Sequence, residues 1–292
     1  MTRILLTGKT GQVGYELHRS LQGLGEIIAL DRSQMDLANL AQVREVIRQI
    51  KPALIVNPAA YTAVDKAESE PELAHRINAE APAVMAEEAK KLGAAVIHYS
   101  TDYVFDGSKA SPYTESDPTC PINVYGSTKL AGEQAIRTAG IPHLILRTSW
   151  VYGMRGKNFL LTVLRLAQER DELRIVADQH GTPTWCRTIA DTTSHIVAQL
   201  ASANKDAARE KWEELSGTYH LTAQGQTTWH GFTQAIVEHA SVARKPLVSP
   251  IATQDYPSPA KRPANSVMSC QRLIDTFCEL PEWRAALGLC QD

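Results

Sequence analysis

The chain lacks the features that would direct it to a membrane or to nucleic acid. No apolar run approaches the ~20 residues of a membrane span, and the N-terminus leads directly into a strand-like run with no room for a signal peptide. The formal net charge is only −2, with acidic and basic residues interspersed, so there is no basic patch. We therefore expect a cytoplasmic protein with small-molecule partners.

Cysteines are few and scattered. The five cysteines are odd in number and lack the spacing of metal ligands; they are Cys120, Cys186, Cys270, Cys278 and Cys290. This pattern predicts reduced thiols rather than a disulfide framework, and it assigns them no role.

The sequence does have enough apolar material for a large core, because 43% of its 292 residues are hydrophobic. Apolar runs alternate with helical patterns, which predicts parallel strands joined by right-handed crossovers. We expect strands at 3–7, 26–30, 53–57, 94–100 and 143–148, and helices near 12–22, 39–50, 78–92 and 124–139.

A glycine-rich turn follows the first predicted strand. Residues 3–7 lead into Gly8-Lys9-Thr10-Gly11-Gln12-Val13-Gly14, and a helical pattern follows. Glycines permit a tight turn and let backbone N–H groups approach a pyrophosphate at the positive end of the helix. We expect a dinucleotide to contact Gly8, Thr10, Gly11, Gln12, Val13 and Gly14; the alternative is a loop that only turns the chain.

The second predicted strand ends in Asp31, twenty residues after Gly11, where an acid usually binds the adenosine ribose. Asp31 would accept the two ribose hydroxyls of NAD and repel the 2′-phosphate of NADP. Adjacent Arg32 would attract that phosphate. We therefore expect either NADH or NADPH to serve as cofactor.

These patterns predict an α/β protein with a doubly wound, Rossmann-type parallel sheet in an NAD(P)-binding domain, residues 1–150. After Trp150 the alternation loosens, prolines cluster, and helices are expected near 157–170, 187–202 and 229–243. We interpret 151–292 as a smaller C-terminal substrate domain, with some segments returning to the sheet. The charged stretch 204–214 is predicted to be a solvated helix or loop with Trp212 packed beneath it.

Tyr125 and Lys129 lie four residues apart in a predicted helix and so share one face. A free phenol has a pKa of ~10, and a nearby cation lowers that value. We therefore expect Lys129 to lower the pKa of Tyr125 and make it a proton donor to a carbonyl. An amphipathic surface pair is the alternative.

With these residues, the chain resembles the extended short-chain dehydrogenase/reductase family over essentially its whole length. The motif Thr7-Gly8-x-x-Gly11-x-x-Gly14 is similar to the family's cofactor loop, and Asn57-Pro58-Ala59-Ala60 to its strand-four motif. Ser100-Thr101 with Tyr125-x-x-x-Lys129 is similar to its catalytic set. The resemblance implies further cofactor contacts at Asp36, Leu37, Ala59, Ala60, Tyr61, Tyr125 and Lys129.

Four blocks narrow the resemblance to the family's reductases of dTDP-linked 4-keto-6-deoxy sugars. They are residues 98–105, 147–152, 178–184 and 262–266. The resemblance implies that NAD(P)H reduces the C4 ketone of dTDP-4-dehydro-L-rhamnose to dTDP-L-rhamnose, for cell-surface polysaccharide. Tyr125 would protonate the C4 oxygen, Lys129 would also bind the nicotinamide ribose, and Thr101 would hydrogen-bond the ketone oxygen.

Tyr103 bears on a rival reaction within the family. Sugar-nucleotide 4,6-dehydratases carry an acid directly after the Thr-Asp pair, whereas this chain has Tyr103 after Thr101 and Asp102. Elimination needs that second acid or base, so dehydration is disfavoured. Three alternatives stay open: another dTDP-sugar reductase, a 4-epimerase, and a non-catalytic, dinucleotide-binding regulatory subunit like the relative that partners methionine adenosyltransferase.

Substrate contacts are expected at the ends of strands and in the C-terminal half. Asp102 would contact the sugar, and Trp150 would present its ring to a face of the deoxysugar, although it could equally fill the domain interface. Arg262, followed by Pro263, offers a fork-shaped donor for a diphosphate. Asn158 and the loop 179–184 fall in regions that the family uses near its substrate.

Some relatives hold Mg²⁺ between subunits through carboxylates. Where some of them carry a glutamate after Pro183, this chain reads Thr184-Trp185-Cys186-Arg187, and a positive charge there disfavours that site. Metal ligands are therefore left unassigned, and a monomer or a homodimer fits the sequence equally.

Overall fold

A six-stranded parallel sheet forms the centre of the molecule, in the order β10-β5-β4-β3-β1-β2. The computed structural model describes residues 2–201, 205–240 and 244–291. The strands are β1 (Arg3–Leu6), β2 (Glu26–Ala29), β3 (Leu54–Asn57), β4 (Ala95–Thr101), β5 (His143–Thr148) and β10 (Gly217–His220). The predicted α/β class with a parallel sheet is confirmed, and the first five strands lie where the sequence places them.

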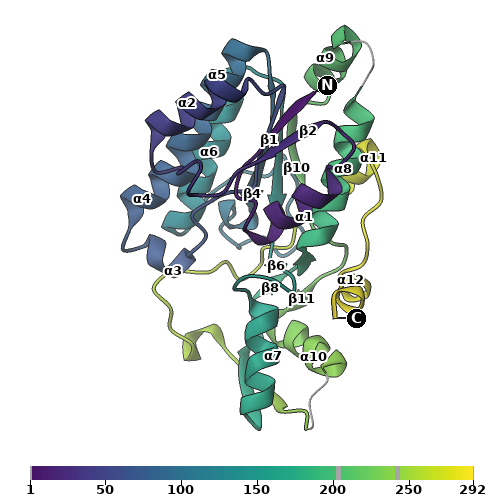
Figure 1. Cartoon of the computed structure of the whole chain (residues 1–292). Coiled ribbons are helices and arrows are strands. Elements are labelled where there is room, and N and C mark those ends of the chain that lie inside the picture. Colours follow the sequence, from purple (N-terminus) through teal and green to yellow (C-terminus); the bar gives the residue numbers. More distant parts are fainter. Residues whose placement is uncertain (1, 202–204, 241–243, 292) are drawn as a thin grey trace.

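Helices cover both faces of this sheet, as a doubly wound fold requires (Figure 1). On β1, Ile4 and Leu6 belong to one core cluster and Leu5 to the other, because side chains alternate along a strand. The helices on the first face are α1 (Gln12–Ser20), α8 (Cys186–Leu200) and α11 (Gln271–Thr276). Those on the second face are α2 (Leu40–Ile50), α5 (Ala81–Leu92) and α6 (Val124–Ala139).

The helix predicted at 78–92 starts earlier than expected. It begins as α4 (Pro71–His75), with proline in the first turn, and passes through a π-helical turn, η1 (Arg76–Glu80), into α5. Asn78 in that turn is buried and binds both backbone groups of Tyr61 and the hydroxyl of Thr128. The π turn thus fixes the chain that follows β3 against α6.

The chain after residue 150 is divided between two places. β10, α8 and α11 join the sheet, whereas a lobe below it packs around a separate apolar cluster (Figure 1). The helices of this lobe are α7 (Phe159–Glu169), α10 (Trp229–His239) and α12 (Trp283–Gln291). Its short strands are β6 (Val151–Tyr152), β7 (Glu172–Val176), β8 (His180–Gly181), β9 (Thr184–Trp185), β11 (Thr227–Thr228) and β12 (Leu247–Ile251). A boundary at residue 150 stays a prediction.

The charged stretch forms helix α9 (Lys205–Glu214), and Trp212 packs against the core of the sheet as predicted. The remaining short helices are α3 (Val64–Ala67), η2 (Asp102–Val104) and η3 (Thr253–Asp255). The predicted helix ends at 202 and 243, and Asn204 of the charged stretch, lie outside the described residues. In the described part of the chain, no helix is both long and apolar enough to cross a membrane.

Helix α6 approaches its neighbours very closely. A Cβ at Gly126 would overlap the backbone oxygen of Tyr103, and one at Gly132 would overlap that of Asn78. Asn123 caps the helix by accepting from the Gly126 N–H at 2.7 Å. These contacts fix the height of α6 above the carboxyl end of β4.

Gly126→Ala should therefore destabilise the protein by about 1–3 kcal/mol, because the extra methyl group forces α6 away from Tyr103. Urea unfolding measures this change. Gly288→Ala in α12 is the matched control, since no atom lies within 4 Å of its added Cβ. It should stabilise the chain by up to about 1 kcal/mol, through helix propensity and a less flexible unfolded state. Equal destabilisation by both variants would contradict the close-approach argument.

Candidate active site

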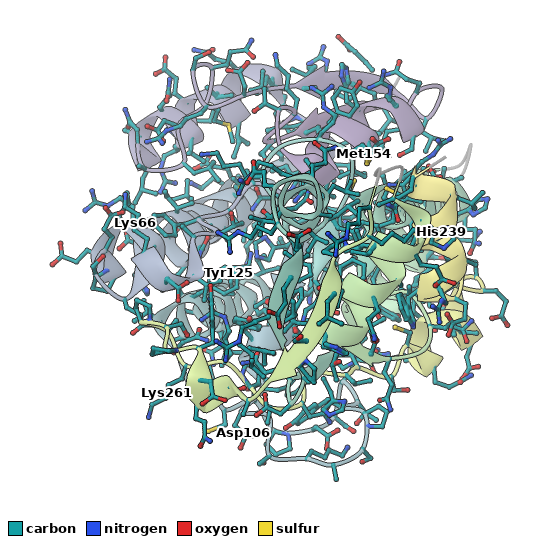
Figure 2. The ribbon with its side chains drawn as sticks, turned by 90° about the horizontal axis from the view of Figure 1, so that it is seen from below. Lys66, Asp106, Tyr125, Met154, His239 and Lys261 are labelled. Carbon is teal, nitrogen blue, oxygen red and sulfur yellow. The ribbon has the colours of Figure 1, made fainter. Side chains whose placement is uncertain are left out.

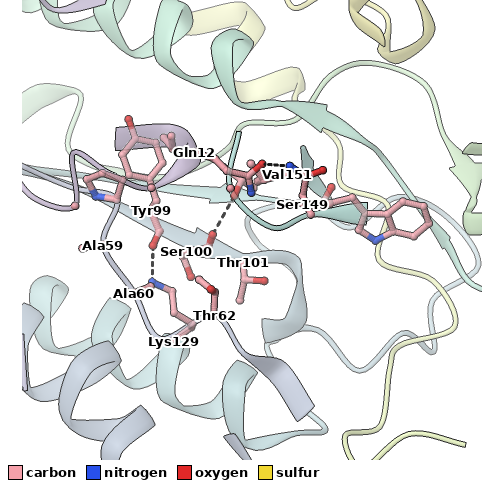
Figure 3. Close-up of a pocket in the computed structure, with 18 of the residues that line it drawn as sticks. Gln12, Ala59, Ala60, Thr62, Tyr99, Ser100, Thr101, Lys129, Ser149 and Val151 are labelled. Carbon is pink, nitrogen blue, oxygen red and sulfur yellow. Dashed lines mark hydrogen bonds between the residues drawn. The ribbon is translucent and has the colours of Figure 1, made fainter. Parts of the chain in front are cut away.

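A cavity of about 650 Å³ opens at the carboxyl ends of the central strands, between the sheet and the lower lobe. Strand order reverses there, between β1 and β3, which is where doubly wound sheets bind ligands. Its lining includes the glycine loop, the ends of β3, β4 and β5, and part of the lower lobe (Figure 3). Tyr125 lies toward the middle of the molecule when seen from below, whereas Lys66 and Lys261 lie at its edge (Figure 2).

The glycine loop forms one wall of this cavity. Gly8 has a φ of +59°, and a Cβ at Gly14 would overlap the Gly8 carbonyl, so the turn admits only glycine at both positions. Gly11 is the N-cap of α1 and has no side chain to bind the first N–H groups of the helix. Those N–H groups and the helix dipole fit a pyrophosphate. The predicted contacts Thr10, Gln12 and Val13 also line the cavity.

Ala59 and Ala60 line the same wall, but four other predicted cofactor residues lie outside the lining: Asp31, Asp36, Leu37 and Tyr61. The Asp31 carboxylate accepts from the Ser33 hydroxyl at 2.6 Å and lies 3.4 Å from Lys9 Nζ, and these contacts hold its pKa below the usual value. Arg32 pairs with Asp36 at 3.4 Å. The Tyr61 hydroxyl donates to Glu70. Cofactor roles for these four residues stay predictions.

Lys129 is buried at the cavity wall, with 2% of its surface exposed. Its ammonium donates to the backbone oxygen of Tyr99 at 2.6 Å (Figure 3). It also lies 3.3 Å from His98 Nε2. Burial lowers the pKa of Lys129 to about 8, so the side chain is mostly charged at neutral pH.

Tyr125 also lines the cavity, but its acidity differs from the sequence prediction. Burial raises the pKa of Tyr125 to about 12, and a hydrogen bond with Thr101 offsets only part of that shift. The expected lowering of this pKa by Lys129 does not occur in this structure, where desolvation of Tyr125 dominates and the Lys129 ammonium binds the Tyr99 oxygen. Tyr125 therefore holds its proton at neutral pH.

Thr101 ends β4 and organises the residues after it. Its hydroxyl donates to the Asp102 carboxylate at 3.0 Å and accepts from the Tyr103 N–H. Asp102 is 3% exposed, and within the described residues its Oδ2 has no hydrogen-bond partner. Burial raises the pKa of Asp102 to about 7. All three residues line the cavity, and the Tyr103 ring meets Tyr125 edge-on at 5.9 Å.

Trp150 lines the cavity with one face already covered. It stacks on Trp229, with ring centroids 3.5 Å apart, and packs against the bare Cα of Gly181. Arg262 does not line the cavity. Its two terminal nitrogens bind Asp65, at 3.1 and 2.8 Å, so it does not offer the free fork that the sequence predicts for a diphosphate.

Sequence reasoning missed several cavity residues. Trp229 and Lys157 come from the lower lobe. Ser100, which the sequence did place in the resemblance to the catalytic set, lines the cavity and has a buried hydroxyl without a partner among the described residues. No motif points to Trp229 or Lys157, because the fold brings them to the cavity. Asn158, which the sequence did single out, donates to Gln12 at 2.7 Å and joins the lower lobe to the glycine loop.

A metal site is not evident in the described ranges, where no three His, Cys, Asp or Glu side chains come together in a way that could hold an ion. Arg187 pairs with Asp191 at 3.5 Å. A requirement for Mg²⁺ therefore stays open.

The whole chain, residues 1–292, matches the family described as the RmlD substrate binding domain. The chain belongs to this family. The dTDP-4-dehydrorhamnose reductase of Burkholderia thailandensis is 51% identical, over 99% of this chain and 97% of that protein. The enzyme of the same name from Escherichia coli K12 is 46% identical, over 97% and 95%. A crystal structure of dTDP-4-dehydrorhamnose reductase from Bacillus anthracis in complex with NADP is 34% identical, covers 99% of both chains, and has a TM-score of 0.90.

The raised pKa of Asp102 predicts a pH-dependent stability. The pKa of Asp102 is near 7 in the folded state and ~3.9 in the unfolded state, so the folded protein favours the neutral acid. The contribution of Asp102 to stability is therefore fully present at low pH and is lost as the pH rises toward 7. Asparagine has no such titration. Between pH 5 and pH 8, wild type should lose about 2–3 kcal/mol of unfolding free energy relative to Asp102→Asn, measured in urea.

Asp31→Asn is the control for this measurement. The pKa of Asp31 lies below its usual value, so this carboxylate is ionised throughout pH 5–8 in both the folded and unfolded states. The difference between wild type and Asp31→Asn should then be the same at both pH values. A pH-independent difference for Asp102→Asn as well would refute the raised pKa.

Proposed function

We propose that this protein is an NAD(P)H-dependent dTDP-4-dehydrorhamnose reductase, which reduces the C4 ketone of dTDP-4-dehydro-L-rhamnose to dTDP-L-rhamnose. The observation that carries the proposal is one cavity lined by the glycine loop of α1 and by Tyr125, Lys129 and Thr101. The names of relatives that align over nearly the whole chain, and the NADP complex of one of them, support the substrate and the cofactor.

The residues fit a dinucleotide cofactor. The N–H groups at the start of α1 would hold its pyrophosphate, and Lys129 would bind the nicotinamide ribose. Bound there, the cofactor supplies a hydride to the sugar ketone. Lys9 lies 3.4 Å from Asp31 and offsets the negative charge of this carboxylate, which would otherwise repel a 2′-phosphate. This pairing supports the use of NADPH as well as NADH.

Proton transfer falls to Tyr125. A phenol with a pKa of about 12 keeps its proton until negative charge develops on the C4 oxygen, whose alkoxide is much the stronger base. Thr101, hydrogen-bonded to Tyr125, would turn its hydroxyl from Asp102 to donate to the same oxygen and stabilise that charge. Lys129, one turn along α6, binds the Tyr99 oxygen, so its part in the proposed reaction is to hold the nicotinamide ribose and not to tune the Tyr125 phenol.

Elimination is disfavoured, and the alternatives that the sequence left open differ from reduction in how they use the cofactor. Tyr103 stands where an elimination would need an acid, and the phenol is held against Tyr125 in the cavity wall. A 4-epimerase would not consume reduced cofactor, and a regulatory subunit would bind it without turnover. The proposal includes a cytoplasmic site of action, because the reaction draws on the cell's internal nicotinamide pool, and it supplies a precursor for cell-surface polysaccharide.

Purified protein should oxidise one NADPH for each dTDP-4-dehydro-L-rhamnose added, with loss of absorbance at 340 nm. Parallel reactions with NADH measure the cofactor preference, and omission of the sugar is the control. Binding of NADPH without sugar-dependent oxidation would refute the reductase and favour the regulatory alternative.

Tyr125→Phe should lower kcat about 10²–10⁴-fold and leave the Kd for NADPH unchanged, because only the proton donor is removed. Stopped-flow absorbance and fluorescence titration measure the two quantities. Tyr103→Phe removes a phenol from the same wall and should cost less than tenfold in kcat. A loss below tenfold in Tyr125→Phe would contradict its role as acid.

A further inference from the structure

His98 is a buried histidine with a polar contact at each ring nitrogen. It lies in β4 and has 0% of its surface exposed. Nε2 is 3.3 Å from Lys129 Nζ, and Nδ1 is 3.1 Å from the side-chain amide of Asn57. Nothing in the proton transfer described above uses this ring.

The ammonium of Lys129 requires acceptors at this depth. It carries three N–H donors, and leaving a donor of a buried charge unpaired is strongly unfavourable. The Tyr99 carbonyl oxygen accepts one of them at 2.6 Å. A neutral imidazole offers the second acceptor, at Nε2.

The ring is neutral for two reasons. Burial, and then the adjacent charge of Lys129, hold the pKa of His98 well below its usual value. An imidazolium would also place two cations 3.3 Å apart, with Glu133 further along α6 as the neighbouring acid.

Acceptance at Nε2 fixes the rest of the network. The proton must then lie on Nδ1. The structure places Asn57 Nδ2 at His98 Nδ1 and has Asn57 Oδ1 accept from the Thr7 hydroxyl, so the network requires the Asn57 amide to be turned by 180°, with its oxygen at Nδ1 and its NH₂ group at Thr7. Thr7 Oγ1 lies 2.7 Å from Asn57 Oδ1, and it accepts from the Ala59 N–H at 3.3 Å. A row of hydrogen bonds therefore runs from Lys129 through His98, Asn57 and Thr7 to the cofactor wall at Ala59.

We propose that His98 is a positioning residue for the reduction proposed above: its Nε2 accepts from Lys129 and holds the ammonium at the cavity wall, in register with the loop after β3. The inference rests on the proposed function. It explains why a histidine interrupts a strand whose preceding residues, Val96 and Ile97, are apolar and buried. An apolar residue at 98 would leave the ammonium with the Tyr99 oxygen as its one acceptor among the contacts described.

Two substitutions separate positioning from packing. His98→Gln can place an amide oxygen near the position of Nε2, whereas the shorter side chain of His98→Asn reaches only the position of Nδ1. The glutamine variant should keep kcat and the Kd for NADPH within about threefold of wild type. The asparagine variant should lose at least tenfold in kcat, bind NADPH more weakly, and keep its melting temperature within a few degrees.

His220→Gln is the matched control. His220 is also 0% exposed, but it lies in β10, contacts the Ser269 oxygen and does not line the cavity. Its replacement should leave kcat within threefold. Wild-type kcat in His98→Asn, or equal losses in the glutamine and asparagine variants, would overturn the proposal.

A measurement on the unmodified protein covers the case in which a His98 variant fails to fold. In ¹⁵N-histidine-labelled wild type near pH 7, the buried His98 ring should show a protonated Nδ1 and a bare Nε2. The Nε2–H tautomer or an imidazolium would overturn the inference. Failure of wild type to oxidise NADPH with the sugar would instead refute the proposed reaction, and the tautomer measurement would still stand.

Discussion

The close approach of helix α6 to the sheet is the constraint on which the site depends. Gly126 and Gly132 let the helix touch the backbones of Tyr103 and Asn78, and a buried bidentate ion pair between Glu133 and Arg147 ties it to β5. Because α6 packs so close to the sheet, the buried Lys129 side chain reaches the backbone of β4. A methyl group in either place would lift the ammonium from its acceptors.

Burial imposes opposite pKa shifts on Tyr125 and Lys129 of this helix. It raises the pKa of Tyr125 and lowers that of Lys129, because desolvation disfavours the charged form of each side chain. The result suits a proton donor, since the phenol stays loaded at neutral pH. The Tyr99 oxygen and His98 lie within hydrogen-bond distance of the Lys129 ammonium, and these contacts oppose the loss of its proton.

The cavity is a joint product of the sheet and the lower lobe. Asn158 at the start of α7 binds Gln12 at the start of α1, and Trp150 stacks on Trp229 across the lobe. A cofactor held at α1 and a sugar held by the lower lobe would therefore meet at Tyr125. This arrangement explains why residues far apart in the chain serve one reaction.

The sequence by itself determined the local parts: the strands, the glycine turn, the Tyr125 and Lys129 pair, and the family resemblance. Each rests on a period or spacing within a short segment, which the chain carries before it folds. It did not determine the helix start at Pro71, which C-terminal segment returns to the sheet, the Arg262–Asp65 pair or the raised pKa of Tyr125. Those follow from contacts between distant segments and from desolvation. Only the tertiary structure decides what surrounds a side chain, so only it could place His98 against Lys129 and Trp229 against Trp150.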